Sequence, residues 1–573
     1  MRVSWCPPDP TNTVSVSNPI FVPADFGLTG DPGEPTMAEM IDWIHGADVK
    51  DEDNDPATTV RNSMGDTLHA QPASVVYSID SSGNPNLVVF TATNDGYLHA
   101  VDGSTGIELW SFIPRELLTD FTDLYKNENI NFKHYGIDGD IVPIVKDGNN
   151  DGKIDDPSHD FVYLVFGMRR GGDNYYALDV TNKTAPKLKW IQSYPEMGQS
   201  WSPPVAARVD VNTSAQTSPD EAVLIIGGGY DTAHDTAPHP STDDLEGAGI
   251  VMLDLETGAR VWHAGKNVGV TEGLIAPRMT RSIPTRVRVL DLTDDGYADR
   301  MYAADLGGQI WRFDIMNDNT PANLVAGGVI AQLGAEGQGA TPSAAETRRF
   351  YNTPDIALFS DYGQDRRYLS VSIGSGYRAH PLDSSASDRF YSLRDPHIFK
   401  QLTQAEYNSY PIAVDSDLLE VAGTFDNTVS ATQRGWKLTL PPGEKVLADS
   451  TTFDNSIFFV TFEPTVASSD PCQAGLSVNR LYRVNIANGD PVTDLSAVDP
   501  NDPVAVDAER VTQLEQGGIA PKPTFIFPSP VDPTSCTGSA CSPEPIGCIG
   551  VECFDPNFAN NPRRTLWTKA GVE

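Results

Sequence analysis

Two acidic loops carry oxygen-bearing residues at a spacing that suits calcium. The first is "DGNNDGKIDD" at residues 147–156, and the second is "DLTDDGYAD" at residues 291–299. Calcium prefers about six to eight oxygen ligands, which a tight loop supplies from side chains at positions 1, 3 and 5, the carbonyl at position 7 and a later carboxylate. A glycine at position 6 permits the sharp turn, and both loops have one. Both loops are therefore predicted calcium sites.

The predicted ligands of Ca2+ occupy the same positions in the two loops. In the first loop they are the side chains of Asp147, Asn149, Asp151 and Asp155 and the carbonyl of Lys153. In the second loop they are the side chains of Asp291, Thr293, Asp295 and Asp299 and the carbonyl of Tyr297. The alternative is that each loop is a turn rich in Asp, Asn and Gly that binds no metal. The match of five positions, found twice, favours calcium.

Neither loop is a true EF-hand. Position 12, where an EF-hand has glutamate, is Ser158 in the first loop and Tyr302 in the second. The flanking segments "DIVPIVK" and "RVRVL" resemble strands, so each loop is predicted to connect two strands compactly. Calcium would neutralise the clustered carboxylates and stabilise that connection. A third acidic run, "DEDND" at residues 51–55, lacks the glycine and is interpreted as a solvated linker.

The elements that must hold these loops follow a repeated strand pattern. In each repeat, apolar residues alternate up to an Asp, and a turn often of the form Asp-x-x-Thr-Gly leads to a second strand whose Trp can pack on the neighbouring sheet. The repeats are "GYLHAVDGSTGIELWSF" (96–112), "NYYALDVTNKTAPKLKW" (174–190), "GIVMLDLETGARVWHAG" (249–265) and "GQIWRFDI" (308–315), with weaker copies at 389–396 and 480–492. Their spacing of roughly 60–90 residues exceeds the about 40–50 of a minimal propeller blade.

These repeats predict an all-β fold, a modified, about seven-bladed β-propeller with long inserted loops. At 573 residues the chain is too long for one ordinary core, so one large propeller or several domains are the candidates. Long amphipathic helices are scarce, and the segment 37–45 is among the few good candidates. The predicted organisation is an N-terminal linker or extension at 1–62, the propeller at 63–530, and a Cys-rich tail at 531–573 that closes on the propeller.

The formal net charge of -38 argues against nucleic acid as a partner, because the summed field repels phosphate backbones. No apolar run reaches the length that a membrane-spanning segment needs. The N-terminus "MRVSWCPPDP" lacks the basic and apolar regions of a secretory signal.

Four of the six cysteines, Cys536, Cys541, Cys548 and Cys553, crowd into the Pro/Gly-rich tail. Structural zinc is the alternative to disulfides, but zinc sites usually space their cysteines more closely and often add histidine. Two disulfides in the tail, and hence an oxidising compartment, are favoured. With disulfides but no signal, we expect a processed or truncated chain, or one exported by a leader not seen here.

The chain also resembles the PilC/PilY-type family of type IV pilus biogenesis and tip-adhesin proteins. Several motifs follow in the family's order, and each alone is weak, but together they span roughly five hundred residues. They are "GDTLHAQP" (65–72), "TNDGYLHAVDGSTGIELWSFIP" (93–114), "HYGIDGDIVP" (134–143), "RRGGDNYYALDVTN" (169–182), "GGGYD" (227–231), "DLTDDGYADRMYAADLGGQIWRFDI" (291–315), "GSGYRAHPL" (374–382) and "RRTLWTK" (563–569).

The resemblance implies a calcium-binding, non-enzymatic propeller that supports pilus assembly, extension and surface attachment. It implies a calcium site at 291–299, whose occupancy is linked to pilus extension against retraction. The implied location is extracellular, at the pilus tip on the cell surface and reached through the periplasm. The implied partners are pilins or minor pilins and a host or abiotic surface. The family's N-terminal half, often a von Willebrand factor A-like domain, is not part of this sequence.

Two other classes of propeller share parts of this pattern. A quinoprotein dehydrogenase that binds pyrroloquinoline quinone (PQQ) shares the Asp…Trp repeat, but it needs around eight regular repeats and a central calcium cradle, and many have adjacent cysteines. Here the full repeat occurs only two or three times and no two cysteines are neighbours. A carbohydrate-binding lectin would need exposed Trp and Tyr, whereas most aromatic residues here occupy strand positions. The histidines of the family motifs, His69, His99, His134 and His380, are interpreted as packing or turn residues.

Overall fold

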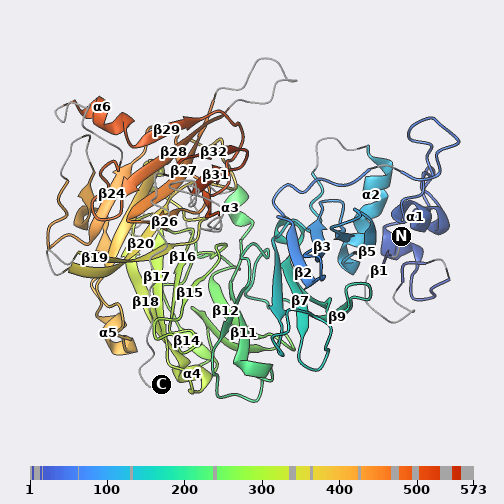
Figure 1. Cartoon of the computed structure of the whole chain (residues 1–573), viewed down its shortest axis with the longest axis horizontal. Coiled ribbons are helices and arrows are strands. Elements are labelled where there is room, and N and C mark those ends of the chain that lie inside the picture. The colour runs from blue at the N-terminus through green and yellow to red at the C-terminus, as the bar shows by residue number, and fades with distance from the viewer. Residues whose placement is uncertain are drawn as a thin grey trace. The chain divides into compact units, whose positions relative to one another are not determined.

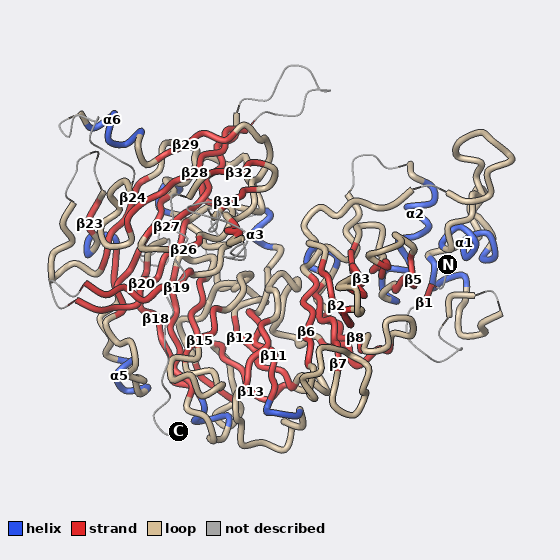
Figure 2. The backbone as a smooth tube through the Cα atoms, viewed as in Figure 1, coloured by secondary structure: helices blue, strands red, loops and turns tan. Residues whose placement is uncertain are grey.

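The computed structural model describes residues 3–4, 13–15, 17–61, 63–128, 133–236, 242–334, 343–361, 366–421, 423, 427–465, 477–492, 502–528 and 545–556. Strands dominate these residues, and the helices are short (Figure 2). By internal contacts the chain divides into two compact units. Unit 1 comprises Met1–Leu306, Trp311–Val329 and Gln401–Tyr410, and unit 2 comprises Gly307–Ile310, Ile330–Lys400 and Pro411–Glu573.

The described strands form seven sheets, numbered here along the chain (Figure 1). Sheet 1 has the order β1 (Val3–Ser4), β5 (Glu108–Phe112), β4 (Leu98–Asp102), β3 (Pro85–Ala92), β2 (Ala73–Ile79). Sheet 2 is β6 (Ile141–Lys146), β7 (Phe161–Gly167), β8 (Tyr175–Asp179), β9 (Lys187–Gln192). Sheet 3 is β10 (Val205–Arg208), β11 (Ala222–Gly227), β12 (Gly249–Asp254), β13 (Arg260–Gly265), β14 (Gly273–Ile275). Sheet 4 is β15 (Arg288–Leu290), β16 (Arg300–Ala304), β17 (Gln309–Ile315), β18 (Val325–Gln332), β22 (Ala413–Val414).

The remaining three sheets belong to unit 2. Sheet 5 is β19 (Asp355–Asp361), β20 (Arg366–Gly374), β21 (Arg389–Asp395), β24 (Gly435–Thr439), β23 (Leu419–Glu420). Sheet 6 is β25 (Lys445–Val446), β27 (Ser456–Pro464), β28 (Ser477–Asn485), β29 (Val511–Leu514), with β26 (Thr451–Phe453) beside β27. Sheet 7 is β30 (Thr524–Ile526), β31 (Ile546–Ile549), β32 (Glu552–Phe554). In the fully described sheet 2, consecutive strands pair antiparallel, as in a propeller blade.

The helices are α1 (Met37–Ile44), α2 (Phe121–Lys126), α3 (Ala233–Thr236), α4 (Pro321–Leu324), α5 (Gln404–Asn408) and α6 (Pro503–Ala508). The predicted helix near residue 37 is confirmed as α1. It starts at a capping box, in which the Glu39 N–H donates to the Thr36 hydroxyl at 3.2 Å and Thr36 N–H donates to the Glu39 carboxylate at 2.8 Å. Its buried face, including Trp43, packs on Phe121 of α2.

The predicted Asp-x-x-Thr-Gly turns have the same hydrogen bonds in two sheets. At the end of β4, the Asp102 carboxylate accepts the N–H (3.0 Å) and hydroxyl (2.9 Å) of Thr105. At the end of β12, Asp254 accepts the same two groups of its own Thr at 2.9 and 2.8 Å. Gly106 and Gly258 close these turns with φ of 70°, a left-handed conformation that favours glycine. The turn residues therefore determine where the second strand begins.

The predicted packing of tryptophans on neighbouring sheets is also confirmed. In unit 1, Trp110 of β5 donates its indole N–H to the carbonyl of Lys183 at 2.9 Å, so sheet 1 is joined to sheet 2. Trp190 of β9 joins sheet 2 to sheet 3 through the Leu255 carbonyl at 3.0 Å. In unit 2, Trp436 of β24 joins sheet 5 to sheet 6 in the same way. Each bond reaches the residues that follow the third strand of the next sheet, so consecutive sheets pack as propeller blades do.

A buried ionic group attaches residues 401–410 to unit 1. The carboxylate of Asp314, which has no exposed side-chain surface, accepts from Arg300 at 2.6 Å and from Arg312 at 2.9 Å. It also accepts from the Tyr407 hydroxyl at 2.7 Å and the Leu402 N–H at 2.9 Å. Because a buried charge must be paired and hydrogen-bonded, this segment is held where its residues complete the group.

Candidate functional site

Both predicted calcium loops connect the first two strands of a sheet. Residues 147–160 lie between β6 and β7, and residues 291–299 lie between β15 and β16. Each loop begins with an aspartate directly after the outgoing strand and ends with a buried aspartate directly before the returning strand: Asp160 in the first loop, with 4% of its surface exposed, and Asp299 in the second, with 8%. The expected position of the loops between strands is therefore confirmed.

The shorter loop, 291–299, is organised around its first and last carboxylates. Asp291 accepts the N–H of Asp294 at 2.7 Å and of Gly296 at 2.8 Å. Asp299 accepts the N–H groups of residues 292 and 293 at 2.6 and 2.9 Å, and the hydroxyl of Thr293 at 3.1 Å. Gly296 has a φ of 88°, which explains the glycine at position 6.

The loop 291–299 is also attached to the preceding sheet. Tyr297, whose carbonyl is a predicted ligand, donates its hydroxyl to Glu221 at 3.0 Å and accepts from Arg208 at 2.9 Å. The Arg208 guanidinium lies over the Tyr297 ring, 4.3 Å from its centre, and the Arg208 carbonyl accepts the N–H of Ala298 at 2.9 Å. The hydrogen bond to Glu221 raises the pKa of Tyr297. The loop is thus fixed to the end of β10.

The longer loop, 147–160, repeats the same local pattern. Asp147 accepts the N–H of Gly152, at position 6, at 2.8 Å, as Asp291 does in the other loop. Asp151 accepts the N–H of Lys153 at 2.9 Å, and Asn149 accepts that of Asp151 at 3.0 Å. Asp295 of the second loop likewise accepts the N–H two residues on, at 2.9 Å. Positions 1, 5 and 6 therefore have equivalent hydrogen bonds in both loops.

The carboxylate that closes the longer loop is Asp160, which the spacing did not single out. Asp160 accepts the N–H of Gly148 at 3.0 Å, and those of Asp155 and Asp156 at 3.2 and 2.9 Å. The hydrogen bond from Asp156 is the main reason that the pKa of Asp160 is lowered. The predicted ligand Asp155 has an exposed side chain, and among the described residues its carboxylate has no hydrogen-bond donor. By position before the returning strand, Asp160 corresponds to Asp299.

The longer loop likewise reaches the preceding sheet. The N–H of Ile154 donates to the carbonyl of Tyr77, in β2, at 2.8 Å. Ile154 packs against the apolar core that sheets 1 and 2 share. Each loop thus contacts an edge strand of the sheet before its own, β2 in one case and β10 in the other.

Within the described part of the chain, the predicted ligand carboxylates and Asp160 form no ion pairs, whereas Asp156 of the longer loop pairs with His159 at 2.7 Å. None of the salt bridges among described residues involves Asp147, Asp151, Asp155, Asp160, Asp291, Asp295 or Asp299. The donor set is all oxygen, and a carboxylate oxygen that accepts one N–H retains another lone pair. The residue types present therefore suit a hard divalent cation, but within the described residues neither loop brings three of its carboxylates within 4.8 Å of one another.

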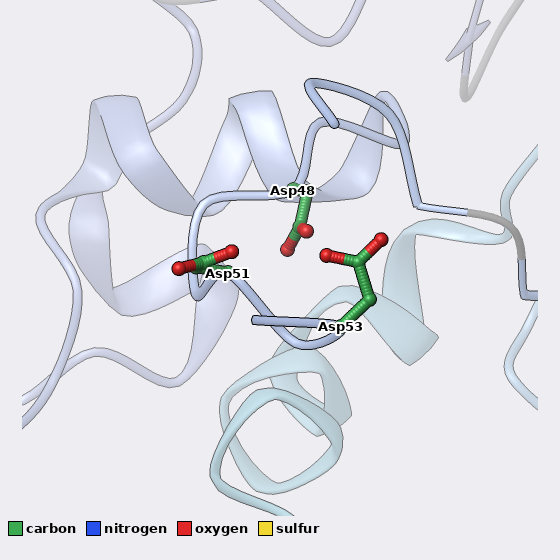
Figure 3. A group of neighbouring side chains, drawn as sticks. All are labelled: Asp48, Asp51 and Asp53. Atoms are coloured by element: carbon green, nitrogen blue, oxygen red, sulfur yellow. The ribbon is translucent and has the colours of Figure 1, made fainter. Parts of the chain in front are cut away.

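Among the described residues, one acidic group brings three carboxylates close together, and it lies outside both predicted calcium loops. Asp48, Asp51 and Asp53 each place a carboxylate oxygen within 4.8 Å of the other two (Figure 3). Asp51 and Asp53 are exposed, in agreement with the solvated segment expected there. No other feature of this group indicates a bound cation, so we assign none to it.

Residues of several sequence motifs contact one another within unit 1. His69 pairs with the buried Asp138 at 2.7 Å. The guanidinium of Arg169 lies 4.2 Å from the Trp201 ring centre, and Arg170 makes two hydrogen bonds to Asp235 at 2.8 and 2.9 Å. The "GDTLHAQP" and "RRGGD" motifs thus hold loops to one another. This agrees with the interpretation of His69 as a packing residue.

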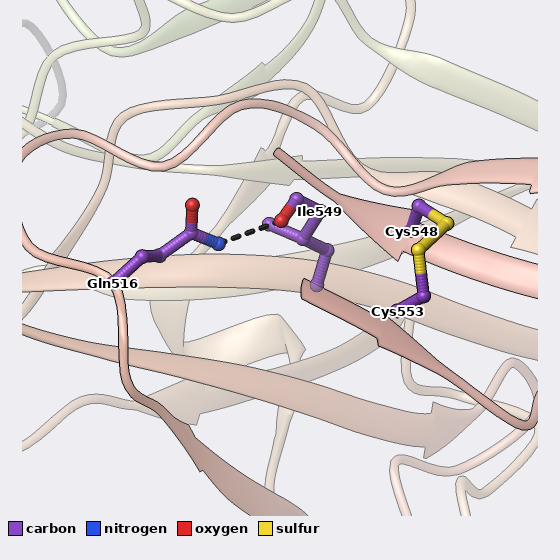
Figure 4. Close-up of a disulfide and its surroundings, with 4 residues drawn as sticks. All are labelled: Gln516, Cys548, Ile549 and Cys553. Atoms are coloured by element: carbon purple, nitrogen blue, oxygen red, sulfur yellow. Dashed lines mark hydrogen bonds between the residues drawn. A yellow bond between two sulfur atoms is a disulfide. The ribbon is translucent and has the colours of Figure 1, made fainter. Parts of the chain in front are cut away.

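One of the two disulfides expected in the tail lies in the described residues. Cys548 and Cys553 are bonded across the β31–β32 hairpin, with their Cα atoms 4.1 Å apart (Figure 4). Gln516 donates to the carbonyl of Ile549 at 2.7 Å and so anchors the hairpin. Cys536 and Cys541 lie outside the described residues, as does the "RRTLWTK" motif. No helix within the described ranges is long and apolar enough to cross a membrane.

Comparison with known proteins adds independent information. The family model of the PilY1 beta-propeller domain matches residues 54–361, which is more than half of the chain. The type IV pilus biogenesis factor PilY1 of Pseudomonas aeruginosa is 25% identical over 520 residues, covering 78% of this chain and 41% of that protein. A PilY1 homolog of Xylella fastidiosa is 26% identical over 383 residues, covering 62% of this chain and 27% of that protein. The chain thus spans less than half the length of these relatives.

A solved structure supports the same fold. The crystal structure of the Pseudomonas aeruginosa PilY1 C-terminal domain matches with a TM-score of 0.52 and 20% sequence identity, covering 82% of this chain and 92% of that chain. With the seven sheets, this confirms the predicted all-β propeller of about seven blades. The chain belongs to the family of PilY1 β-propeller domains.

Proposed function

We propose that this chain is the calcium-binding propeller of a type IV pilus biogenesis factor, with a role in pilus assembly and in attachment to surfaces. The pilus role is supported by the relatives, which are named type IV pilus biogenesis factors. The calcium role is supported by one observation above all: two loops at equivalent positions of two sheets share the hydrogen bonds made at positions 1, 5 and 6, and in the described part of the chain their predicted ligand carboxylates form no ion pairs.

Calcium in these loops would strengthen the boundary between neighbouring sheets. Each loop belongs to one sheet and is hydrogen-bonded to an edge strand of the sheet before it, through Tyr77 in one case and Arg208 in the other. An ion bound only in the folded state stabilises that state, and here it would also offset the repulsion among clustered carboxylates. In the second loop the ligands would be Asp291, Thr293, Asp295, the carbonyl of Tyr297 and Asp299. In the first they would be Asp147, Asn149, Asp151, the carbonyl of Lys153 and Asp160, with Asp155 at the rim.

The proposed setting is the cell surface, at or near the pilus tip. The proposed partners are pilins or minor pilins and the surface to which the pilus attaches. This role is non-enzymatic, because it uses the propeller as a calcium-stabilised scaffold for contacts with other proteins.

The test uses a matched pair of substitutions in the gene for this chain, in the organism that carries it. Asp299→Asn removes a proposed ligand, whereas Asp294→Asn removes an exposed carboxylate of the same loop that is not a proposed ligand and has a φ of 57° that Asn tolerates. We expect fewer surface pili for Asp299→Asn, counted by electron microscopy, and a wild-type number for Asp294→Asn. Normal piliation in a strain that lacks the gene altogether would refute the pilus role.

A further inference from the structure

A cavity of about 900 Å³ lies in unit 1, between sheets 1 and 2. Its walls are the β2–β3 hairpin, the end of the loop 147–160, the start of β7 and the turn after β8. This volume is within the range of roughly 300–1,000 Å³ that small-molecule sites occupy. The proposed pilus role does not use the cavity, although residues of the first proposed calcium site form part of its wall.

The wall formed by the loop is fixed in place from both sides. Ile154 is hydrogen-bonded to Tyr77 of β2, and both residues line the cavity. Asp160, at the other end of this wall, is held by three main-chain N–H groups. The cavity is therefore formed before any ligand arrives, which reduces the cost of ordering on binding.

The lining carries nearly balanced charge and several groups without protein partners. Three lysines (Lys153, Lys183 and Lys187) face four aspartates (Asp80, Asp155, Asp160 and Asp179). Within the described residues, the amines of Lys153 and Lys187 and the carboxylate of Asp155 make no hydrogen bond or ion pair. Lys183 is held by Asn86 at 2.5 Å. The cavity thus offers both donors and acceptors, without the single-sign field that a polyanion or polycation needs.

An aromatic ring completes the lining. Phe161, at the start of β7, is only partly buried, and its ring stacks on Tyr163 with centres 4.3 Å apart. Tyr163 is itself fixed by a hydrogen bond to Glu256 at 3.0 Å. Ser78, Thr181 and Asn182, which carry hydroxyl and amide groups, also line the cavity. A rigid aromatic ring beside carboxylates, amines, amides and hydroxyls matches a ligand with a C–H face and many hydroxyl groups.

We propose that this cavity binds a short oligosaccharide. Hydroxyl groups of the sugar bond to Asp155, Lys153 and Lys187, and one ring face packs on Phe161. The site is separate from the proposed pilus role, but it shares the loop 147–160 with the first proposed calcium site. We also expect calcium to strengthen sugar binding, and this expectation alone rests on the proposed calcium site.

Saturation-transfer NMR on the full chain tests this inference. The probes are maltotriose, N,N′,N″-triacetylchitotriose and 3′-sialyllactose, which separate neutral, amide-bearing and acidic sugars. We expect transfer to at least one of them. Lys153→Ala and Lys187→Ala, both at exposed positions, should each weaken binding about tenfold, since a hydrogen bond to a charged group contributes roughly that factor. Phe161→Ala should weaken it at least as much.

Matched controls and a chelator complete the experiment. Lys522→Ala and Phe399→Ala change exposed residues outside the cavity and should leave binding unchanged. No transfer to any of the three probes, or equal binding by the cavity variants and the controls, would overturn the proposal. Sugar binding that persists without calcium would leave the site in place and remove only its link to the loop. Calcium binding without sugar binding would refute the site alone.

Discussion

The substitution Asp160→Asn tests which aspartate is the last calcium ligand of the longer loop. Spacing names Asp155 as the last ligand, whereas the structure places Asp160 where Asp299 stands in the other loop. We expect Asp160→Asn to abolish the calcium-dependent stabilisation from this loop. Asp155→Asn, in the same loop and with the same change of charge, should retain most of it.

The size of the effect follows from binding to the folded state alone. With a dissociation constant of about 10⁻⁴–10⁻³ M and about 2 mM calcium, one site contributes about 0.7–1.8 kcal/mol to the free energy of unfolding. That corresponds to about 0.6–1.5 °C in melting temperature for a chain of 573 residues, at about 0.8 °C per kcal/mol. Asp160→Asn also weakens three hydrogen bonds that need no calcium, at about 1–3 kcal/mol. The contribution of the site is therefore the difference between the melting temperature with calcium and the melting temperature with chelator.

Differential scanning calorimetry measures this difference, and isothermal titration gives the stoichiometry. Each variant is made in an Asp299→Asn background, so that only the longer loop contributes. The wild-type longer loop should give one calcium per chain, Asp155→Asn one, and Asp160→Asn none. The opposite order, with Asp155→Asn losing the calcium shift and Asp160→Asn keeping it, would refute the correspondence between Asp160 and Asp299.

Two further predictions concern the blades themselves. Trp190→Phe should cost about 1–2 kcal/mol more in unfolding free energy than Trp262→Phe, because Trp190 bonds the Leu255 carbonyl whereas the buried indole N–H of Trp262 has no partner among the described residues; urea unfolding measures both, and equal costs would contradict the role of the Trp190 bond. Hydrogen bonds from Ser104 first, and from Thr105, lower the pKa of Asp102 from 3.8 to about 2. Because this pKa is lowered in the folded state, the stability it contributes is complete above 3.8 and is lost as the pH falls toward about 2. The unfolding free energy of Asp102→Asn should therefore depend less on pH across that range. An unchanged dependence would show that the turn does not stabilise the charged form of Asp102.

Much of the blade architecture was predictable because its signals are local. The Asp-x-x-Thr-Gly turn satisfies its own N–H groups within a few residues, so Asp102 and Asp254 mark the strand ends in the sequence. The alternating apolar residues determine which face of each strand is buried. The tryptophans could be assigned to packing between sheets, although their acceptors, such as the Leu255 carbonyl, lie too far along the chain to be named in advance.

The acidic loops were likewise predictable in one part and not in another. Positions 1, 3, 5 and 6 lie within a few residues of one another, so the template found Asp147, Asn149, Asp151 and Gly152 together with their counterparts in the second loop. The closing carboxylate depends on where the returning strand begins. In the shorter loop that strand starts at Arg300, directly after position 9, whereas in the longer loop it starts at Phe161, five residues later. A template with fixed spacing cannot account for this difference in loop length.

The sequence by itself determined the fold class, the family and the location of the two acidic loops, because each depends on residues close together in the chain. The tertiary structure alone decided which carboxylate closes the longer loop, and which strand each loop contacts in the preceding sheet. It also created the cavity between sheets 1 and 2, where Lys153 and Phe161 meet the β2–β3 hairpin from more than sixty residues earlier. Contacts of this kind arise only when separate blades pack together, because the pairing of distant segments is set by the burial of their shared core.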